Sequence, residues 1–124
     1  MALWVKTSTV RVLRGRLESW TRVAPSGRKM LCQFCPTCGT RIFHQTVGQE
    51  GVLSIKPGTL NDTKWLRPVA HVWSEQAQPW VEAEADCLQF PGNPDDFGSL
   101  ISAWQLKKQS GGMQKPNNSL EPTA

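Results

Sequence analysis

Residues 34–44 read Phe34-Cys35-Pro36-Thr37-Cys38-Gly39-Thr40-Arg41-Ile42-Phe43-His44. Two residues separate Cys35 from Cys38, so a single tight turn can direct both thiolates toward one metal ion. Pro36 restricts φ inside that turn, and Gly39 gives a permissive backbone just after the second sulfur. This spacing is typical of structural zinc sites, and we therefore predict Cys35 and Cys38 as ligands of Zn²⁺.

The pair leaves a tetrahedral zinc ion incomplete, because such an ion takes four ligands. The remaining cysteines and histidines of the chain are Cys32, Cys87, His44 and His71. His44 lies six residues after the turn and is a candidate third ligand, although a histidine on a strand is more often structural. Cys87 belongs to no ligand cluster, and His71, beside Trp73, is a candidate for a substrate pocket, although burial near the core is the more common role. We therefore predict at most one weakly bound zinc ion per chain, which two chains of a homodimer could share.

Other roles for the cysteines are less favoured. An iron–sulfur run through Cys32, Cys35 and Cys38 would need a fourth cysteine where the chain has Ile42. A redox Cys-x-x-Cys normally opens a helix, whereas residues 40–45 have the pattern of a strand. The N-terminus lacks the apolar core of a secretory signal, and no apolar run is long enough for a membrane. We therefore expect reduced cysteines and a cytoplasmic protein.

The charge of the chain is unevenly distributed. The net charge is +4, with eight Lys/Arg and two acidic residues in positions 1–50 and three Lys/Arg and seven acidic residues in positions 51–100. A basic half beside a metal-binding turn suggests an alternative function, a small zinc-ribbon module that binds nucleic acid or protein. No aromatic stacking motif accompanies the arginines, so we favour solvent-exposed arginines and do not expect a nucleic-acid partner.

The hydrophobic pattern predicts a mainly β fold. Alternating or β-rich segments bounded by Gly, Pro and Asn predict strands at residues 10–13, 17–23, 29–34, 40–46, 52–55 and 69–73. The strands on either side of the Cys-x-x-Cys pair would form a hairpin with the metal at its tip.

One short helix is expected near the C-terminus. Asn93 or Asp95 would cap it, and its apolar face would comprise Leu100, Ile101 and Trp104. We predict a single domain over residues 1–106. Residues 107–124 are rich in Gln, Ser, Gly, Asn and Pro, so we predict a disordered tail there.

Six motifs follow one another in a recognisable order: Ser26-Gly27-Arg28, Phe34 to Thr40, Lys56 to Asp62, His71-Val72-Trp73, Pro79-Trp80 and Phe90-Pro91-Gly92. In this order the chain resembles the glutathione-dependent formaldehyde-activating enzyme family, also called the GFA or CENP-V/GFA domain, over roughly residues 4–100. The resemblance implies an Mss4-like fold of β-sheets with two zinc sites. It also implies a carbon–sulfur lyase that acts on thiol adducts of glutathione with aldehydes, such as S-hydroxymethylglutathione.

The resemblance assigns two metal ligands and leaves the others open. In the family, four cysteines hold a structural zinc ion and a separate cluster of three cysteines holds a catalytic one. Cys35 and Cys38 match the later pair of the structural site, and nothing in the chain matches the other ligands. We therefore expect the chain to be the C-terminal portion of such a domain, without assignable catalytic residues and without activity as it stands. Arg28 and Arg41 are candidate contacts for the carboxylates of glutathione.

Overall fold

The computed structural model describes residues 1–111 of the chain, which fall into two compact units. The first unit comprises Met1–Asn61 and the second begins at Asp62. The prediction of a mainly β fold with one short C-terminal helix is confirmed. Among the described residues, no helix has both the length and the apolar character needed to span a membrane.

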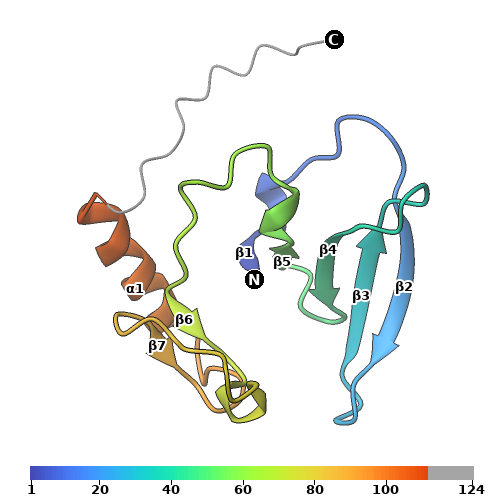
Figure 1. Cartoon of the computed structure of the whole chain (residues 1–124). Coiled ribbons are helices and arrows are strands. Elements are labelled where there is room, and N and C mark those ends of the chain that lie inside the picture. Colours follow the sequence, from blue (N-terminus) through green and yellow to red (C-terminus); the bar gives the residue numbers. More distant parts are fainter. Residues whose placement is uncertain (112–124) are drawn as a thin grey trace. The chain divides into compact units, whose positions relative to one another are not determined.

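The first unit is an antiparallel sheet of five strands in the order β1-β5-β4-β3-β2 (Figure 1). The strands are β1 (Leu3–Lys6), β2 (Glu18–Val23), β3 (Lys29–Phe34), β4 (Arg41–Thr46) and β5 (Val52–Ile55). The predicted strands from residue 17 to residue 55 are thus present, with ends that differ by at most one residue. They form because apolar and polar residues alternate between turns that contain Gly27, Gly39 and Gly48, all at positive φ.

A row of directly opposite residues crosses the sheet. It runs through Trp20, Cys32, His44, Ser54 and Trp4, on β2, β3, β4, β5 and β1. Paired residues of neighbouring strands share a face, so these five side chains lie on the same side of the sheet. Cys32 and Ser54 are each only 2% exposed, so the centre of the row is buried.

The N-terminal segment differs from the prediction. Residues 10–13 form no strand, and the strand at the sheet edge is instead β1, which pairs with β5. After β1 the chain turns at Thr7, whose N–H donates to the carbonyl of Gly51 (3.1 Å) and whose hydroxyl donates to that of Glu50 (2.6 Å). An alternating segment becomes a strand only beside a partner, and β1 already occupies the open edge of β5.

The second unit contains two very short parallel strands and the helix. Strand β6 (Ala70–His71) pairs with β7 (Leu88–Gln89), and helix α1 spans Gly98–Gln109. The predicted strand at residues 69–73 is reduced to β6, because Trp73 adopts left-handed backbone angles (φ 58°) and the chain turns there.

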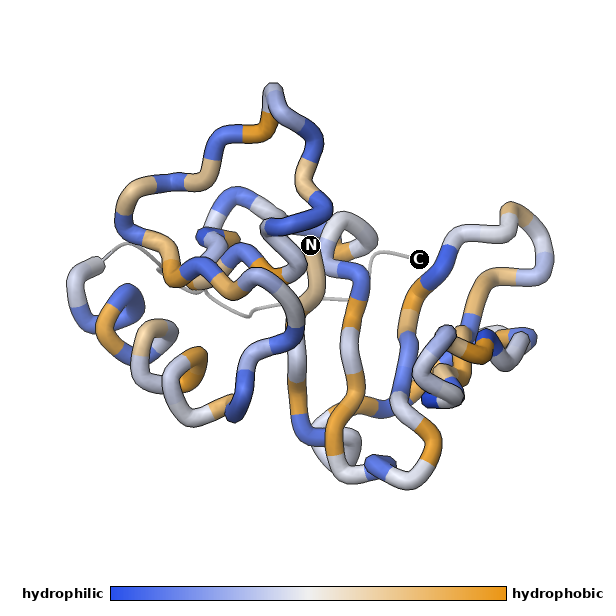
Figure 2. Tube along the Cα trace, turned by 90° about the horizontal axis from the view of Figure 1, so that it is seen from below, coloured by the Kyte–Doolittle hydropathy of each residue, from blue (hydrophilic) through white to orange (hydrophobic). Residues whose placement is uncertain are grey.

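The inward face of helix α1 agrees with the prediction at Leu100 and Trp104 but not at Ile101. Its inward side comprises Leu100, Ala103, Trp104 and Lys107, a stripe with helical spacing, whereas Ile101 is 54% exposed. Figure 2 shows how hydrophobic positions recur along the coil of α1. The ring of Trp104 packs edge to face against Trp65, with centroids 6.2 Å apart.

Both ends of α1 correct the sequence-based boundaries. The Asp96 carboxylate, rather than Asn93 or Asp95, accepts the N–H groups of Gly98 and Ser99 at the start of the helix. The helix continues to Gln109, so residues 107–109 are helical and do not belong to a disordered tail. The rest of the predicted tail, from residue 112 on, lies outside the described residues.

Candidate metal centre

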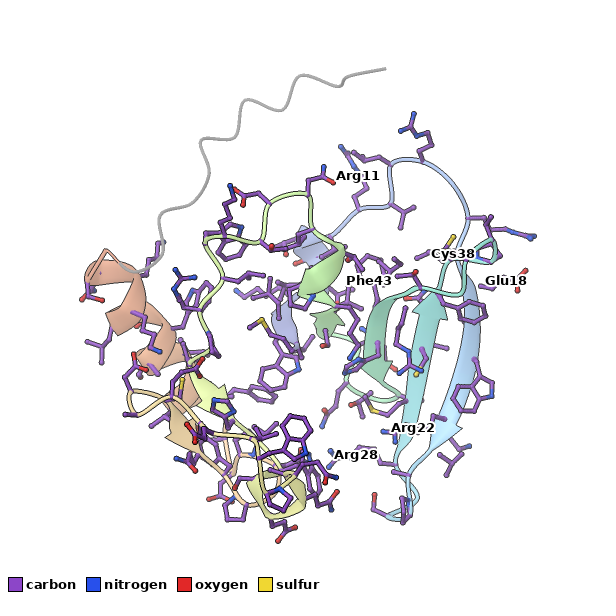
Figure 3. All side chains as sticks on the ribbon, viewed as in Figure 1. Arg11, Glu18, Arg22, Arg28, Cys38 and Phe43 are labelled. Carbon is purple, nitrogen blue, oxygen red and sulfur yellow. The ribbon has the colours of Figure 1, made fainter. Side chains whose placement is uncertain are left out.

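The Cys-x-x-Cys pair lies at the tip of the hairpin formed by β3 and β4, as the sequence predicts (Figure 3). The Cys35 N–H donates to the carbonyl of Thr40 (2.9 Å), and the Gly39 N–H donates to the carbonyl of Cys35 (2.8 Å). Gly39 has a φ of +73°, a conformation that glycine adopts at little cost. These two hydrogen bonds hold the turn that carries both sulfurs.

Thr40 influences the chemical state of Cys38. The Thr40 hydroxyl is hydrogen-bonded to Cys38 Sγ at 3.1 Å, and the Cys38 side chain is exposed. This hydrogen bond, followed by those from the Thr40 backbone and the Cys35 side chain, lowers the pKa of the Cys38 thiol. A lower pKa favours the thiolate, which is the form that binds metals and reacts with electrophiles.

The pair supplies two positions of a tetrahedral zinc site. Within residues 1–111, no group of three neighbouring metal-ligating side chains includes Cys35 or Cys38. His44, the candidate third ligand, instead lies opposite Cys32 and Ser54 in the row that crosses the sheet. The thiols at the hairpin tip therefore fit half of a four-ligand zinc site.

His44 is a partly buried histidine with an unusual environment. Burial, followed by the positive charges of Lys56, Arg41 and Arg22, lowers the pKa of His44 from 6.5 to about 4. Its Nδ1 atom and the Ser54 hydroxyl are both buried and have no hydrogen-bond partner among the described residues. His44 is thus neutral at neutral pH and belongs to the interior of the sheet.

The arginines of the basic half do not form one group. Arg28 follows the β2–β3 turn, at the end of β3 opposite to Cys38 (Figure 3). Arg41 begins β4 directly after the hairpin tip. Arg11 lies at the other end of this unit from Arg22 and Arg28 (Figure 3). Of the two candidate contacts for a glutathione carboxylate, only Arg41 is next to the cysteine pair.

A second group of ligand-type side chains forms in the C-terminal unit from His71, Glu84 and Cys87. His71 Nε2 lies 2.9 Å from Glu84 Oε2, and Cys87 Sγ lies 3.5 Å from the same oxygen. One ligand atom from each residue lies within 4.8 Å of the other two. The expectation that Cys87 belongs to no ligand cluster is therefore wrong, and this group could hold a metal ion.

The backbone explains why these three side chains meet. Glu84 and Cys87 are joined by a turn in which the Cys87 N–H donates to the carbonyl of Glu84 (3.1 Å). The segment after the turn pairs with β6, where the Phe90 N–H donates to the carbonyl of His71 (2.9 Å). A search for cysteine and histidine spacing misses this group because one of its members is a carboxylate. The Glu-x-x-Cys spacing was the only local signal.

The pKa values of Cys87 and Glu84 depend on how deeply each side chain is buried and on its hydrogen bonds. Cys87 is buried, and burial together with its hydrogen bond to Glu84 raises the pKa of its thiol, whereas Lys107 opposes the increase. Glu84 is exposed, and its hydrogen bonds, first with His71 and then with Cys87, lower the pKa of its carboxyl. The group thus combines one exposed carboxylate, one partly exposed imidazole and one buried thiol.

Lys107 brings a positive charge to the buried side of this group. Its Nζ lies 3.6 Å from Cys87 Sγ, 2.9 Å from the Asp86 carboxylate and 2.8 Å from the carbonyl of Pro68, to which it donates. The ammonium can therefore stabilise a thiolate at Cys87, while Asp86 balances its charge.

The chain is mainly β, with paired cysteines at a hairpin tip and a separate His–Glu–Cys group. These features place it in the class of candidate metal-binding proteins. The sequence model of the family described as "Glutathione-dependent formaldehyde-activating enzyme" matches residues 1–76, more than half of the chain, and the chain belongs to this GFA family. The matched residues include all five strands of the first sheet, both hairpin cysteines and His71, and they end before Glu84 and Cys87. No curated protein and no solved structure matches the chain.

Proposed function

We propose that the chain is a zinc-binding GFA protein in which Cys35 and Cys38 hold the ion, and that the reaction class of its domain is carbon–sulfur lyase chemistry on glutathione–aldehyde adducts, in which this chain alone is inactive. The observation that carries this proposal is the position of the cysteine pair. It occupies the tip of a hydrogen-bonded hairpin that lies wholly inside the residues matched by the family. The family name supports the substrate class.

The reaction joins or splits one carbon–sulfur bond. The glutathione sulfur adds to the carbonyl carbon of formaldehyde, and the thiol proton is transferred to the carbonyl oxygen, which gives S-hydroxymethylglutathione. A zinc ion held by Cys35 and Cys38 would supply charge that stabilises a thiolate or polarises the oxygen of the adduct. Arg41, next to the hairpin tip, offers a guanidinium that can pair with a carboxylate of glutathione.

The number of ligands limits what the hairpin pair can do by itself. A catalytic zinc ion takes three protein ligands and keeps its fourth position open, whereas Cys35 and Cys38 provide two. A second chain can supply the missing pair to a shared ion, which would then have a structural role. We therefore expect no measurable condensation of glutathione with formaldehyde by this chain alone.

Two measurements test the proposal on the full chain. Metal analysis of protein purified without chelator should find zinc. The Cys35→Ser/Cys38→Ser variant should contain less zinc, because it lacks the ions bound at the hairpin tip. An unchanged zinc content in that variant would overturn the proposed ligands. Exchange NMR of glutathione and formaldehyde, with and without added zinc, then measures the lyase reaction. A zinc-dependent rate that disappears in the double variant would show that the hairpin site is catalytic despite its ligand count.

A further inference from the structure

We propose that His71, Glu84 and Cys87 form a second zinc site, which has three protein ligands and one open position. This site is distinct from the hairpin pair, and two of its three ligands lie beyond the residues matched by the family. It goes beyond the proposed function, because that function uses only Cys35 and Cys38 as metal ligands.

The first argument is the distance between the ligand atoms. Zinc bonds of about 2.0–2.3 Å in a tetrahedron place ligand atoms about 3.3–3.8 Å apart. Here Cys87 Sγ and His71 Nε2 lie 3.5 Å and 2.9 Å from Glu84 Oε2, and all three atoms lie within 4.8 Å of one another. Small side-chain rotations are enough to replace these hydrogen bonds with bonds to an ion.

The second argument is the chemistry of the ligands. One sulfur, one imidazole nitrogen and one carboxylate oxygen suit a borderline-soft ion such as Zn²⁺, whereas Mg²⁺ and Ca²⁺ favour ligand sets of oxygen atoms. A thiolate at Cys87 and a carboxylate at Glu84 together balance the charge of the ion. Lys107 Nζ lies 3.6 Å from Cys87 Sγ and 2.9 Å from the Asp86 carboxylate, so the positive charge beside the sulfur is itself paired.

The third argument concerns rigidity and access. The three ligands are positioned by the pairing of β6 with β7 and by the turn between Glu84 and Cys87. The Cys87 side is buried, while Glu84 is exposed, so an ion can enter from solvent on the Glu84 side. Three protein ligands leave a fourth position for a water molecule or a substrate sulfur, which is the arrangement of catalytic zinc sites.

The experiment isolates this site from the hairpin pair. In the Cys35→Ser/Cys38→Ser background, the full chain is freed of metal and titrated with Zn²⁺ or with Co²⁺ as a spectroscopic probe. We expect about one equivalent to bind, with a thiolate-to-cobalt charge-transfer band that arises from Cys87. Adding Cys87→Ser should abolish the band, and adding Glu84→Gln or His71→Gln should weaken binding by about tenfold or more.

Matched controls show whether an effect comes from the loss of a metal ligand. The alternatives are the loss of any nearby carboxylate, the loss of any cysteine, or unfolding of the variant. Glu82→Gln changes an exposed carboxylate two residues from Glu84 and should leave the affinity unchanged, and Cys32→Ala should leave the cobalt band in place. Circular dichroism of each variant checks that the fold is retained. Failure of the background variant to bind metal, or a band that survives Cys87→Ser, would overturn the second site without affecting the hairpin ligands. Conversely, unaltered zinc content in the hairpin variant would overturn the proposed function alone.

Discussion

At the scale of single residues, Thr40 determines how readily Cys38 ionises. Replacing the hydroxyl in Thr40→Val removes the hydrogen bond that contributes most to the lowered pKa of Cys38. The pKa should therefore rise, and less thiolate should be present at neutral pH. In metal-free protein we expect Cys38 to be alkylated by iodoacetamide several-fold more slowly at pH 7, measured by mass spectrometry of the peptide.

Two comparisons check this prediction for Thr40→Val. The difference in rate between the variant and the wild type should vanish at high pH, where the thiol is ionised in both. Cys87, which is buried and has a raised pKa, should react slowly in both proteins. An unchanged alkylation profile would mean that the backbone N–H groups and the Cys35 side chain stabilise the thiolate without the Thr40 hydroxyl.

His44 makes the stability of the chain depend on pH. Its pKa is about 4 in the folded protein and near 6.5 in the unfolded chain, so the unfolded chain binds more protons between these values. The free energy of unfolding is therefore fully retained above pH 6.5 and falls as the pH decreases toward 4. Between pH 6.5 and 5 we expect the free energy of unfolding to fall by about 1 kcal/mol. This is less than the upper limit of about 1.4 kcal/mol for each pH unit, because His44 is only partly buried.

Urea unfolding at the two pH values measures this loss. His44→Gln removes the titrating group, and its free energy of unfolding should change less over the same range. Lys56, Arg41 and Arg22, whose positive charges act on His44, are unchanged in His44→Gln, so the comparison isolates the imidazole. Equal pH dependence in the wild type and the variant would exclude His44 as the source.

At the scale of elements, helix α1 tests which of two neighbouring residues packs against the rest of its unit. Leu100 is 5% exposed and Ile101 is 54% exposed. Truncating a buried leucine removes contacts and leaves a cavity, so Leu100→Ala should lower the free energy of unfolding by about 2–4 kcal/mol. Ile101→Ala should cost less than about 1 kcal/mol. Chemical denaturation of both variants distinguishes them, and an effect at Ile101 as large as that at Leu100 would restore the predicted face, which includes both residues.

At the scale of the whole molecule, the incomplete ligand set of the hairpin predicts association. Two copies of Cys35 and Cys38 would together provide the four thiolates of a structural zinc site. Adding zinc should therefore raise the sedimentation coefficient from that of a monomer to that of a dimer, and a chelator should reverse the change. Cys35→Ser should abolish the response, whereas Cys87→Ser should preserve it. A chain that stays monomeric while the hairpin pair binds a full equivalent of zinc would exclude the shared site.

The elements that could be predicted from the sequence are those whose turns and paired strands lie close together along the chain. The hairpin with Cys35 and Cys38 at its tip was predictable because its turn residues and both of its strands lie within 18 consecutive positions. The remaining strands from residue 17 to residue 55 followed from the same alternation. These elements rest on local turn chemistry and on pairing between neighbours in sequence, so the pattern alone was enough to define them.

Only the tertiary structure could bring His71 to Glu84 and Cys87. The two strands that position them are two residues long, too short for any periodic pattern, and they pair in parallel across an intervening segment of 16 residues. Similarly, the sequence predicted the helix with both Leu100 and Ile101 on its inward face, and only the packing of α1 within its own unit leaves Ile101 exposed. The sequence by itself therefore determined the β hairpin and its cysteine pair, and long-range backbone pairing decided the second candidate site.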